Sequence, residues 1–261
     1  MKPRTKILAI VNVTPDSFSD GSQYNGLEES LNRCREILAQ GADYLDIGGE
    51  STRPGYQPVG KEEELSRILP LIKILQREES LPVSVDTQKA WVAQRALEAG
   101  AKMINDIWGF QKDPDMAKVA ASFQVPSILM HNQEGSHYDI DLLEAIKISL
   151  HRSIETALKA GLKEDLIILD PGIGFGKTFF HNWEVLRRFN ELQSLGFPLL
   201  LGASRKGFLG EITGEKRADK RDDATLATSL WGVTKGASYL RVHNVKMTRD
   251  GLLVTERLMY G

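Results

Sequence analysis

Residues 167–177 read IILDPGIGFGK, a short apolar run that ends at Asp170 and continues into a glycine-rich turn. A near-continuous run of Ile and Leu is typical of a strand that is buried on both faces of a parallel sheet. The same order of apolar run, polar end and helical segment recurs along the whole chain. This recurrence predicts a fold that is built from repeated strand–helix units.

Eight apolar runs predict eight strands, spaced by about 33 residues on average, which is the length of one strand–helix unit. Helices are predicted between them where apolar residues recur three or four positions apart. The predicted strands are Ile7–Val11, Tyr44–Ile47, Val83–Val85, Met103–Asn105, Ser127–Met130, Ile167–Leu169, Leu199–Leu201 and Tyr239–Val242. The clearest helices are Glu28–Leu38, Glu62–Leu75, Leu142–Leu158 and Trp183–Leu192.

No linker or change of composition divides these units, so we expect one domain over residues 1–261. Eight alternating units predict an α/β fold that is a single (β/α)8 TIM barrel. A doubly wound open sheet is the alternative. In both folds the carboxyl ends of the strands carry the chemistry, so polar residues at those ends are the candidates for a site.

Composition narrows the possible function classes. The chain has 33 Lys and Arg residues against 35 Asp and Glu residues, a net charge of −2, which argues against a nucleic-acid partner. No apolar run approaches the ~20 residues of a membrane span, and the short run at 7–11 does not suffice for a signal peptide. We therefore expect a cytoplasmic protein without a membrane partner. The single cysteine, Cys34, excludes an internal disulfide and fits a small buried side chain.

The polar residues that follow the predicted strands include a group of acceptors. Asp86, Asn105 and Asp170 could bind the donor-rich edge of a flat heterocycle, since a carboxylate makes two parallel charge-assisted hydrogen bonds to an N–C–N edge. A single residue of this kind is often only a helix cap. Many polar groups that meet at one barrel mouth are costly to bury without partners, so together they predict a binding site.

A second group is cationic and predicts an anion site beside the first. Arg53, Lys206, Arg241 and His243 follow predicted strands, and Arg suits bidentate contact with phosphate whereas Lys offers a point charge. Asn12 offers a neutral oxygen that could join phosphate oxygens and waters around Mg²⁺, which takes few protein ligands. We expect no base that is paired with a nucleophile.

Three other kinds of site are not supported by the sequence. Residues 171–178 read PGIGFGKT, one residue short of a P-loop, but Pro171 lacks the backbone N–H that such a loop uses to bind phosphate. The five histidines show no zinc-binding spacing, and the Gly-x-Ser-x-Gly motif of acyl transfer does not occur. The acceptors and cations at the strand ends are therefore the best guide to function.

The chain resembles the dihydropteroate synthases, pterin-binding (β/α)8 enzymes of folate biosynthesis, in four motifs. They are NVTPDSFSDG at 12–21, GESTRPG at 49–55, SRK at 204–206 and Arg-x-His at 241–243. The resemblance implies condensation of 6-hydroxymethyl-7,8-dihydropterin diphosphate with 4-aminobenzoate, with Mg²⁺, to 7,8-dihydropteroate and diphosphate. It also implies a homodimer, for which the outer faces of Thr225–Val233 and Lys246–Leu258 are natural candidates.

The resemblance further implies roles for individual residues. The catalytic set is Asp86, Asp170, Lys206, Arg241 and His243. The pterin site is Asp86, Asn105, Met130, Asp170, Phe175, Gly202 and Lys206. The diphosphate site is Asn12, Arg53, Arg241 and His243, with Mg²⁺ on Asn12. The aminobenzoate pocket is Thr52, Pro54, Phe175, Ser204 and Lys206, and the loops at 12–25 and 48–60 are expected to be mobile lids.

Two positions depart from the family pattern. The family usually has Asp directly after the Arg-x-His motif, whereas this chain has Asn244, and its closing helix contains Gly251. Neither change touches a residue that is assigned to a ligand. They bear on the orientation of His243 and on the stability of the last helix, because glycine costs about 1 kcal/mol in a helix interior.

We expect diphosphate to leave before the amine attacks, through a cation delocalised over the pterin. An aromatic amine is already neutral at pH 7, and cationic groups stabilise the departing oxyanions. Two other functions stay open: a barrel methyltransferase that transfers a methyl group to a corrinoid, and a pterin-binding protein without catalysis. The methyltransferase would have no diphosphate for the cations at 204–206 and 241–243 to meet.

Overall fold

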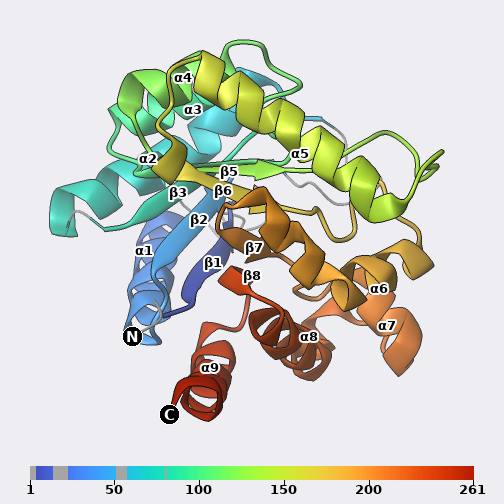
Figure 1. The fold of residues 1–261 in the computed structure, drawn as a ribbon. Helices are drawn as coiled ribbons and strands as arrows, with labels where there is room; N and C mark the ends of the chain where they lie inside the picture. Colours follow the sequence, from blue (N-terminus) through green and yellow to red (C-terminus); the bar gives the residue numbers. More distant parts are fainter. Residues whose placement is uncertain (1–3, 14–22, 51–57, 80) are drawn as a thin grey trace.

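The structure is a computed structural model that describes residues 4–13, 23–50, 58–79 and 81–261. Eight parallel strands pair in chain order and form a closed ring at the centre of the molecule (Figure 1). The strands are β1 (Lys6–Asn12), β2 (Tyr44–Gly48), β3 (Val83–Asp86), β4 (Met103–Asp106), β5 (Ser127–Met130), β6 (Ile167–Asp170), β7 (Leu199–Leu201) and β8 (Ala237–Val242).

Pairing between the first and last strands decides between the two predicted topologies. In β1, Ile7 lies opposite Leu240 of β8, and Leu8 lies opposite Arg241. The ring is therefore closed, so the (β/α)8 barrel is confirmed and the open-sheet alternative is wrong. Several strands extend further than the apolar runs predicted, because the parallel pairing continues into polar ends such as Asp170.

The helices form a layer around the barrel (Figure 1). They are α1 (Gln23–Ala39), α2 (Lys61–Glu79), α3 (Ala90–Glu98), α4 (Met116–Phe123), α5 (Leu142–Lys159), α6 (Phe179–Arg187), α7 (Gly207–Thr213), α8 (Asp222–Thr234) and α9 (Val245–Tyr260), with 3₁₀ turns η2 (Glu164–Leu166), η3 (Phe189–Leu195) and η4 (Ala218–Lys220). Within the described ranges, none of these helices has the length and apolar character needed to cross a membrane.

One predicted helix, Trp183–Leu192, is wrong in its extent. The α-helix ends at Arg187, and the 3₁₀ helix η3 continues the chain from Phe189. Arg188 between them has φ −100° and ψ 14°, outside the α region. Phe189 is fully buried just after this break, so core packing takes precedence here over the regular helical period.

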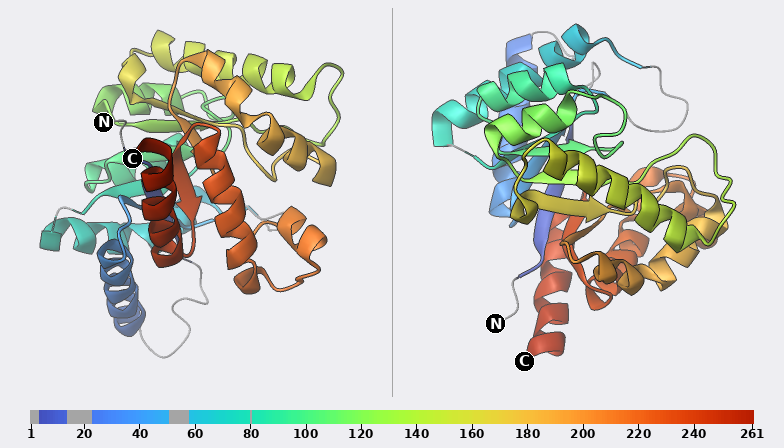
Figure 2. Two further views of the ribbon diagram at one scale, coloured as in Figure 1. Left: turned by 60° about the horizontal axis from the view of Figure 1, so that its bottom comes forward. Right: turned by 45° about the horizontal axis from the view of Figure 1, so that its top comes forward.

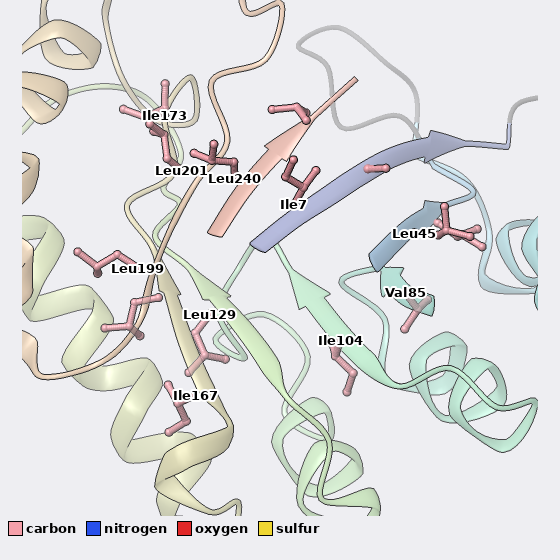
Figure 3. Packing of buried hydrophobic residues seen from close by; sticks show 14 of the residues in the cluster. Ile7, Leu45, Val85, Ile104, Leu129, Ile167, Ile173, Leu199, Leu201 and Leu240 are labelled. Atoms are coloured by element: carbon pink, nitrogen blue, oxygen red, sulfur yellow. The ribbon is translucent and has the colours of Figure 1, made fainter. Parts of the chain in front are cut away.

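Two apolar layers pack on the two faces of the barrel strands. The larger joins strand residues such as Ile7, Leu45 and Val85 to the surrounding helices, and Figure 3 shows part of it. Successive strand residues point to opposite faces, so the alternate positions face the barrel interior. This inner apolar layer consists of Leu8, Met103, Ile128, Ile168 and Leu200, with Tyr44 and Tyr239 packed against it.

The residue two positions after each member of the inner apolar layer also points inward, and it lies at the carboxyl end of the barrel. In four strands this step leads from the inner apolar layer to a polar side chain. The steps are Tyr44 to Asp46, Met103 to Asn105, Ile168 to Asp170 and Tyr239 to Arg241. The strand period alone therefore brings these polar side chains together at the end of the barrel where the site was predicted.

The two last helices, α8 and α9, lie side by side (Figure 2). Gly251 of α9 faces α8, and a Cβ at this position would lie 2.8 Å from Leu226 Cδ1 and 3.2 Å from Leu230 Cδ1. The helix α9 is continuous through Gly251. This glycine therefore allows the close approach of α9 to α8.

Candidate active site

Arg241 joins polar side chains of neighbouring strands into one buried cluster. Its Nε donates to Asp46 Oδ2 at 2.6 Å, and its Nη2 donates to Asp86 Oδ2 at 2.5 Å. Asn105 Nδ2 donates to the same Asp46 oxygen at 2.9 Å. Asp46, Asp86 and Asn105 are all buried. Two buried carboxylates thus share one guanidinium, whose side chain is partly exposed.

This cluster carries more negative than positive charge. Burial raises the pKa of Asp86 to about 7; Arg241 opposes the rise, and the neighbouring Asp46 carboxylate adds to it. Asp46 Oδ1 is buried and has no hydrogen-bond partner among the described residues. Buried acceptors are normally paired, so the cluster is suited to receive a further N–H donor or cation.

Asp170 is a second buried carboxylate at the carboxyl end of the barrel. Its Oδ1 accepts the backbone N–H of Gly172 at 2.7 Å, which holds the carboxyl group in one orientation. A Cβ at Gly202 would lie 3.7 Å from both Asp170 Oδ2 and Arg241 Cβ, so glycine leaves the space between them open. Burial raises the pKa of Asp170, and the Lys206 ammonium group opposes the rise.

Lys206 brings a cation next to Asp170. Its Nζ donates to the carbonyl oxygen of Ile173 and lies 4.4 Å from the centroid of the Phe175 ring. Burial lowers the pKa of Lys206 to about 7, and the Asp170 carboxylate opposes the fall. The aromatic ring and the ammonium group therefore form one wall, on which a flat ligand could stack.

Ser204 and His243 form a hydrogen-bonded pair at the carboxyl end of the barrel. Ser204 Oγ lies 2.9 Å from His243 Nδ1 and accepts the backbone N–H of His243 at 3.2 Å. The sequence predicted that no base is paired with a nucleophile, and it did not predict this contact between a hydroxyl and an imidazole. Because a hydroxyl has one hydrogen, both contacts are satisfied when Ser204 donates to Nδ1, which places the ring proton on Nε2. The pair thus orients the imidazole as an Nε2–H donor.

These side chains surround one cavity of about 450 Å³, a volume that suits a small-molecule ligand. Eight predicted site residues line it: Asn12, Asp86, Phe175, Gly202, Ser204, Lys206, Arg241 and His243. Asn105, Met130 and Asp170 are buried in the adjoining barrel wall. Thr52, Arg53 and Pro54, with much of the loops at 12–25 and 48–60, lie outside the described residues.

Asp46 lies inside the predicted strand Tyr44–Ile47, and no role was predicted for it. The available signal was an acidic residue inside the apolar strand YLDIG, on the inward face that Tyr44 also occupies. A carboxylate that is fully buried in a barrel strand needs a partner, and Arg241 is that partner. Strand alternation could therefore have assigned Asp46 to the site.

Lys177, the lysine of the P-loop-like stretch, is bonded within its own turn. Its Nζ lies 2.9 Å from His131 Nδ1 and donates to Gly172 O at 2.9 Å and to Phe175 O at 3.0 Å. Burial lowers the pKa of His131 to about 3, so the neutral ring accepts from the ammonium group. These bonds hold the turn that carries Phe175, in agreement with the rejection of a P-loop.

The described residues contain no group of three or more His, Cys, Asp or Glu side chains that could hold a metal ion. Asn12, the predicted Mg²⁺ ligand, has an exposed side chain at the end of β1 and lines the cavity. Mg²⁺ is usually bound by one or two carboxylates together with substrate phosphates and waters. Asn12 offers one neutral oxygen in place of a carboxylate, so phosphate oxygens and waters would supply the other ligands.

Comparisons with known proteins agree with the geometry. Residues 8–243 match the family described as pterin binding enzyme. The dihydropteroate synthase of Clostridium beijerinckii is 49% identical over 243 residues, 93% of this chain and 90% of that protein. A dihydropteroate synthase structure from Clostridium difficile, obtained with pteroic acid, has TM-score 0.96 and 46% identity, and covers 99% of this chain and 98% of that one. The dihydropteroate synthase structure from Xanthomonas albilineans in complex with 7,8-dihydropteroate has TM-score 0.90 and 39% identity. It covers 99% of this chain and 95% of that one.

Proposed function

Since the chain belongs to the dihydropteroate synthase family, we propose that its cavity releases diphosphate from the pterin substrate before the amine attacks. The enzyme is a transferase that condenses 6-hydroxymethyl-7,8-dihydropterin diphosphate with 4-aminobenzoate to 7,8-dihydropteroate and diphosphate. The observation that carries the proposal is the gathering of buried acceptors beside Lys206 and Arg241 at one cavity. The relatives reported above are synthases, which favours this function over methyl transfer and over binding without catalysis.

We assign the pterin to the buried acceptors. Its N–C–N edge offers parallel N–H donors, which match a carboxylate in a bidentate, charge-assisted arrangement. Asp86 and Asp170 supply such carboxylates, Asn105 supplies an amide, and Phe175 and Lys206 supply a wall for the ring face. Met130 and Gly202 complete the assigned slot.

We assign the diphosphate to Arg241, His243, Asn12 and Arg53, the last of which lies outside the described residues. Two nitrogens of Arg241 bond carboxylates, so the anion contact falls to Nη1, and His243 contributes its Nε2–H. Asn12 would hold Mg²⁺ together with phosphate oxygens, and the ion would supply charge neutralisation of the leaving group. Aminobenzoate is assigned to Phe175, Ser204 and Lys206, with Thr52 and Pro54 from the undescribed segment.

In the proposed order, the bond between the pterin methylene carbon and the diphosphate oxygen breaks first, and its electron pair leaves with the oxygen. The resulting cation is delocalised over the pterin, where the Asp86 and Asp170 carboxylates stabilise it. The neutral amine then forms the C–N bond and releases one proton to solvent. Ser204 and Lys206 position the amine, so the chain contributes mainly orientation and electrostatics.

This order predicts that the scissile bond breaks in the absence of aminobenzoate. The substrate carries ¹⁸O in the bridge between the methylene carbon and the first phosphorus. We expect the enzyme to scramble this label into the non-bridging positions of the diphosphate, as measured by mass spectrometry or ³¹P NMR. A chelator should slow the scrambling at least about tenfold, because the metal stabilises the departing oxyanions. Complete retention of the label would contradict the order, and scrambling at the same rate in chelator would contradict the Mg²⁺ assignment.

The pH dependence of kcat/KM is expected to have an acidic limb near neutrality. Burial raises the pKa of Asp86 to about 7, and the carboxylate must be ionised to accept two donors, so activity should fall about tenfold per pH unit below this value. Asp46→Asn removes a neighbouring negative charge, which should lower the pKa of Asp86 and move the limb to lower pH. A limb that keeps its position in Asp46→Asn would contradict the coupling.

We also propose that the chain forms a homodimer through the outer faces of α8 and α9. An apolar groove between α6, α7 and α8 is flanked by Trp231 and Ile212, which are 47% and 63% exposed. Ala227→Arg, on the exposed face of α8, should therefore shift the protein to monomer in sedimentation experiments. Ile148→Arg on α5, a matched change of an exposed apolar residue, should not. A dimer that is unaffected by Ala227→Arg would place the interface elsewhere.

Residues 1–261 are proposed to act as one domain in each subunit. The cytoplasmic location stays a prediction from the sequence.

A further inference from the structure

Arg205, between two assigned site residues, has an uncommon backbone conformation. Its φ of +58° lies in the left-handed region, which costs energy for a side chain other than glycine. Ser204 before it bonds His243, and Lys206 after it contacts Ile173 and Phe175. The conformation of Arg205 therefore sets where its two neighbours point.

Residues at the start of α8 bind both the side chain and the backbone of Arg205. Asp222 accepts two hydrogen bonds from the guanidinium, from Nε at 2.6 Å and from Nη2 at 2.8 Å. The backbone N–H of Arg205 donates to Thr225 Oγ1 at 3.0 Å, and its carbonyl oxygen accepts from Arg221 Nη1 at 3.1 Å. A strained residue persists only where its surroundings determine it in this way.

Asp222 also reaches the turn after β8. Asn244 Nδ2 donates to Asp222 Oδ2 at 3.0 Å, and Asn244 Oδ1 accepts the backbone N–H of Met247 as the cap of α9. Asn244 directly follows His243 in the chain. One carboxylate thus ties the turn of Ser204 and Lys206 to the turn of His243. An aspartate at 244 would instead place two carboxylates against each other.

We propose that Asp222 is a positioning residue for this reaction, which fixes Ser204 and Lys206 relative to His243 through Arg205 and Asn244. The proposal rests on the proposed assignment of these residues to aminobenzoate and diphosphate. It also accounts for Asn244: the neutral amide gives Asp222 a donor, and the pair shares a single negative charge opposite Arg205.

The test is a charge exchange between positions 222 and 244. Asp222→Asn should lower kcat/KM for aminobenzoate about tenfold or more, because small displacements of positioning groups have large kinetic effects. Asn244→Asp should also lower it. The double variant restores one carboxylate and one amide with the hydrogen bond reversed, and should recover at least threefold over Asp222→Asn, roughly half of the tenfold loss on a logarithmic scale.

Asp219→Asn is the matched control, since Asp219 makes a similar two-point pair with Arg217 that is exposed to solvent. It should leave kcat/KM unchanged. A second readout needs no turnover: in ¹⁵N NMR spectra, the His243 ring signals should shift in Asp222→Asn and not in Asp219→Asn. The NMR readout also separates this proposal from the proposed function. A parent protein without synthase activity would contradict the proposed function, whereas the His243 ring signals would still test the role of Asp222.

Three results would overturn the proposal. They are an Asp222→Asn variant as active as Asp219→Asn, a double variant no better than Asp222→Asn although both are folded by thermal unfolding, and unchanged His243 ring signals.

Discussion

Replacing Arg241 by alanine is expected to destabilise the protein by about 3 kcal/mol and to abolish measurable turnover, because two buried carboxylates lose their shared cation. Asp46 is fully buried and Asp86 is 8% exposed, so water that enters from the cavity replaces the guanidinium only in part. Denaturant unfolding and steady-state assays measure the two effects. Arg217→Ala, which breaks an exposed pair, should leave the free energy of unfolding nearly unchanged.

The sign of the pH dependence gives a further check on Arg241→Ala. Burial raises the pKa of Asp86 and the Arg241 guanidinium opposes this rise, so without the guanidinium the pKa of Asp86 in the folded state lies further above that of the unfolded chain. The folded state then binds more protons, so its stability falls as pH rises through this window. The deficit relative to the parent should be largest at alkaline pH and should shrink on acidification. A deficit that does not depend on pH, or none, would contradict the cluster.

Asp170→Asn should lower kcat about 100-fold or more without destabilising the fold, because each charge-assisted hydrogen bond contributes about 1.5–3 kcal/mol. The amide oxygen of Asn can still accept the Gly172 N–H, whereas its NH₂ group faces the donors of the pterin. Removing a buried carboxyl group also removes a desolvation cost, since burial raises the pKa of Asp170. Single-turnover kinetics and thermal unfolding measure the two effects.

Asp106→Asn is the control of opposite sign. Both Asp106 oxygens accept backbone N–H groups, from Trp108 at 2.9 Å and Phe110 at 2.8 Å. In Asp106→Asn, the NH₂ group of the new side chain would face one of these two backbone N–H groups, which is a donor like itself. This variant should therefore lose stability and keep its turnover per folded molecule. Near-normal turnover of Asp170→Asn would refute the role of Asp170.

The sequence predicted the barrel and most of the cavity because both follow from the strand period. Once Ile168 and Met103 face the interior, alternation requires that Asp170 and Asn105 do so at the carboxyl end. The extent of α6 escaped prediction because the burial of Phe189 depends on tertiary packing. The pairing of Arg241 with Asp46 escaped for the same reason: the two residues lie 195 positions apart, and local pattern does not reveal partners at that separation.

The residues that support the site were hardest to predict. The left-handed backbone of Arg205 has no signal in the sequence, because it is imposed by contacts from α8. In the sequence, Asn244 is only a departure from the family motif. Its hydrogen bond to Asp222, which the structure shows, gives it a role. Such arrangements depend on pairs of residues from different elements, which propensity and period do not record.

The most direct test mixes the purified protein with 6-hydroxymethyl-7,8-dihydropterin diphosphate, 4-aminobenzoate and Mg²⁺, and quantifies both products by chromatography and a diphosphate assay. We predict 7,8-dihydropteroate and diphosphate in equal amounts, with Asp170→Asn losing both in parallel. Tight binding of the pterin without release of diphosphate, or release of diphosphate without formation of dihydropteroate when aminobenzoate is saturating, would contradict the account.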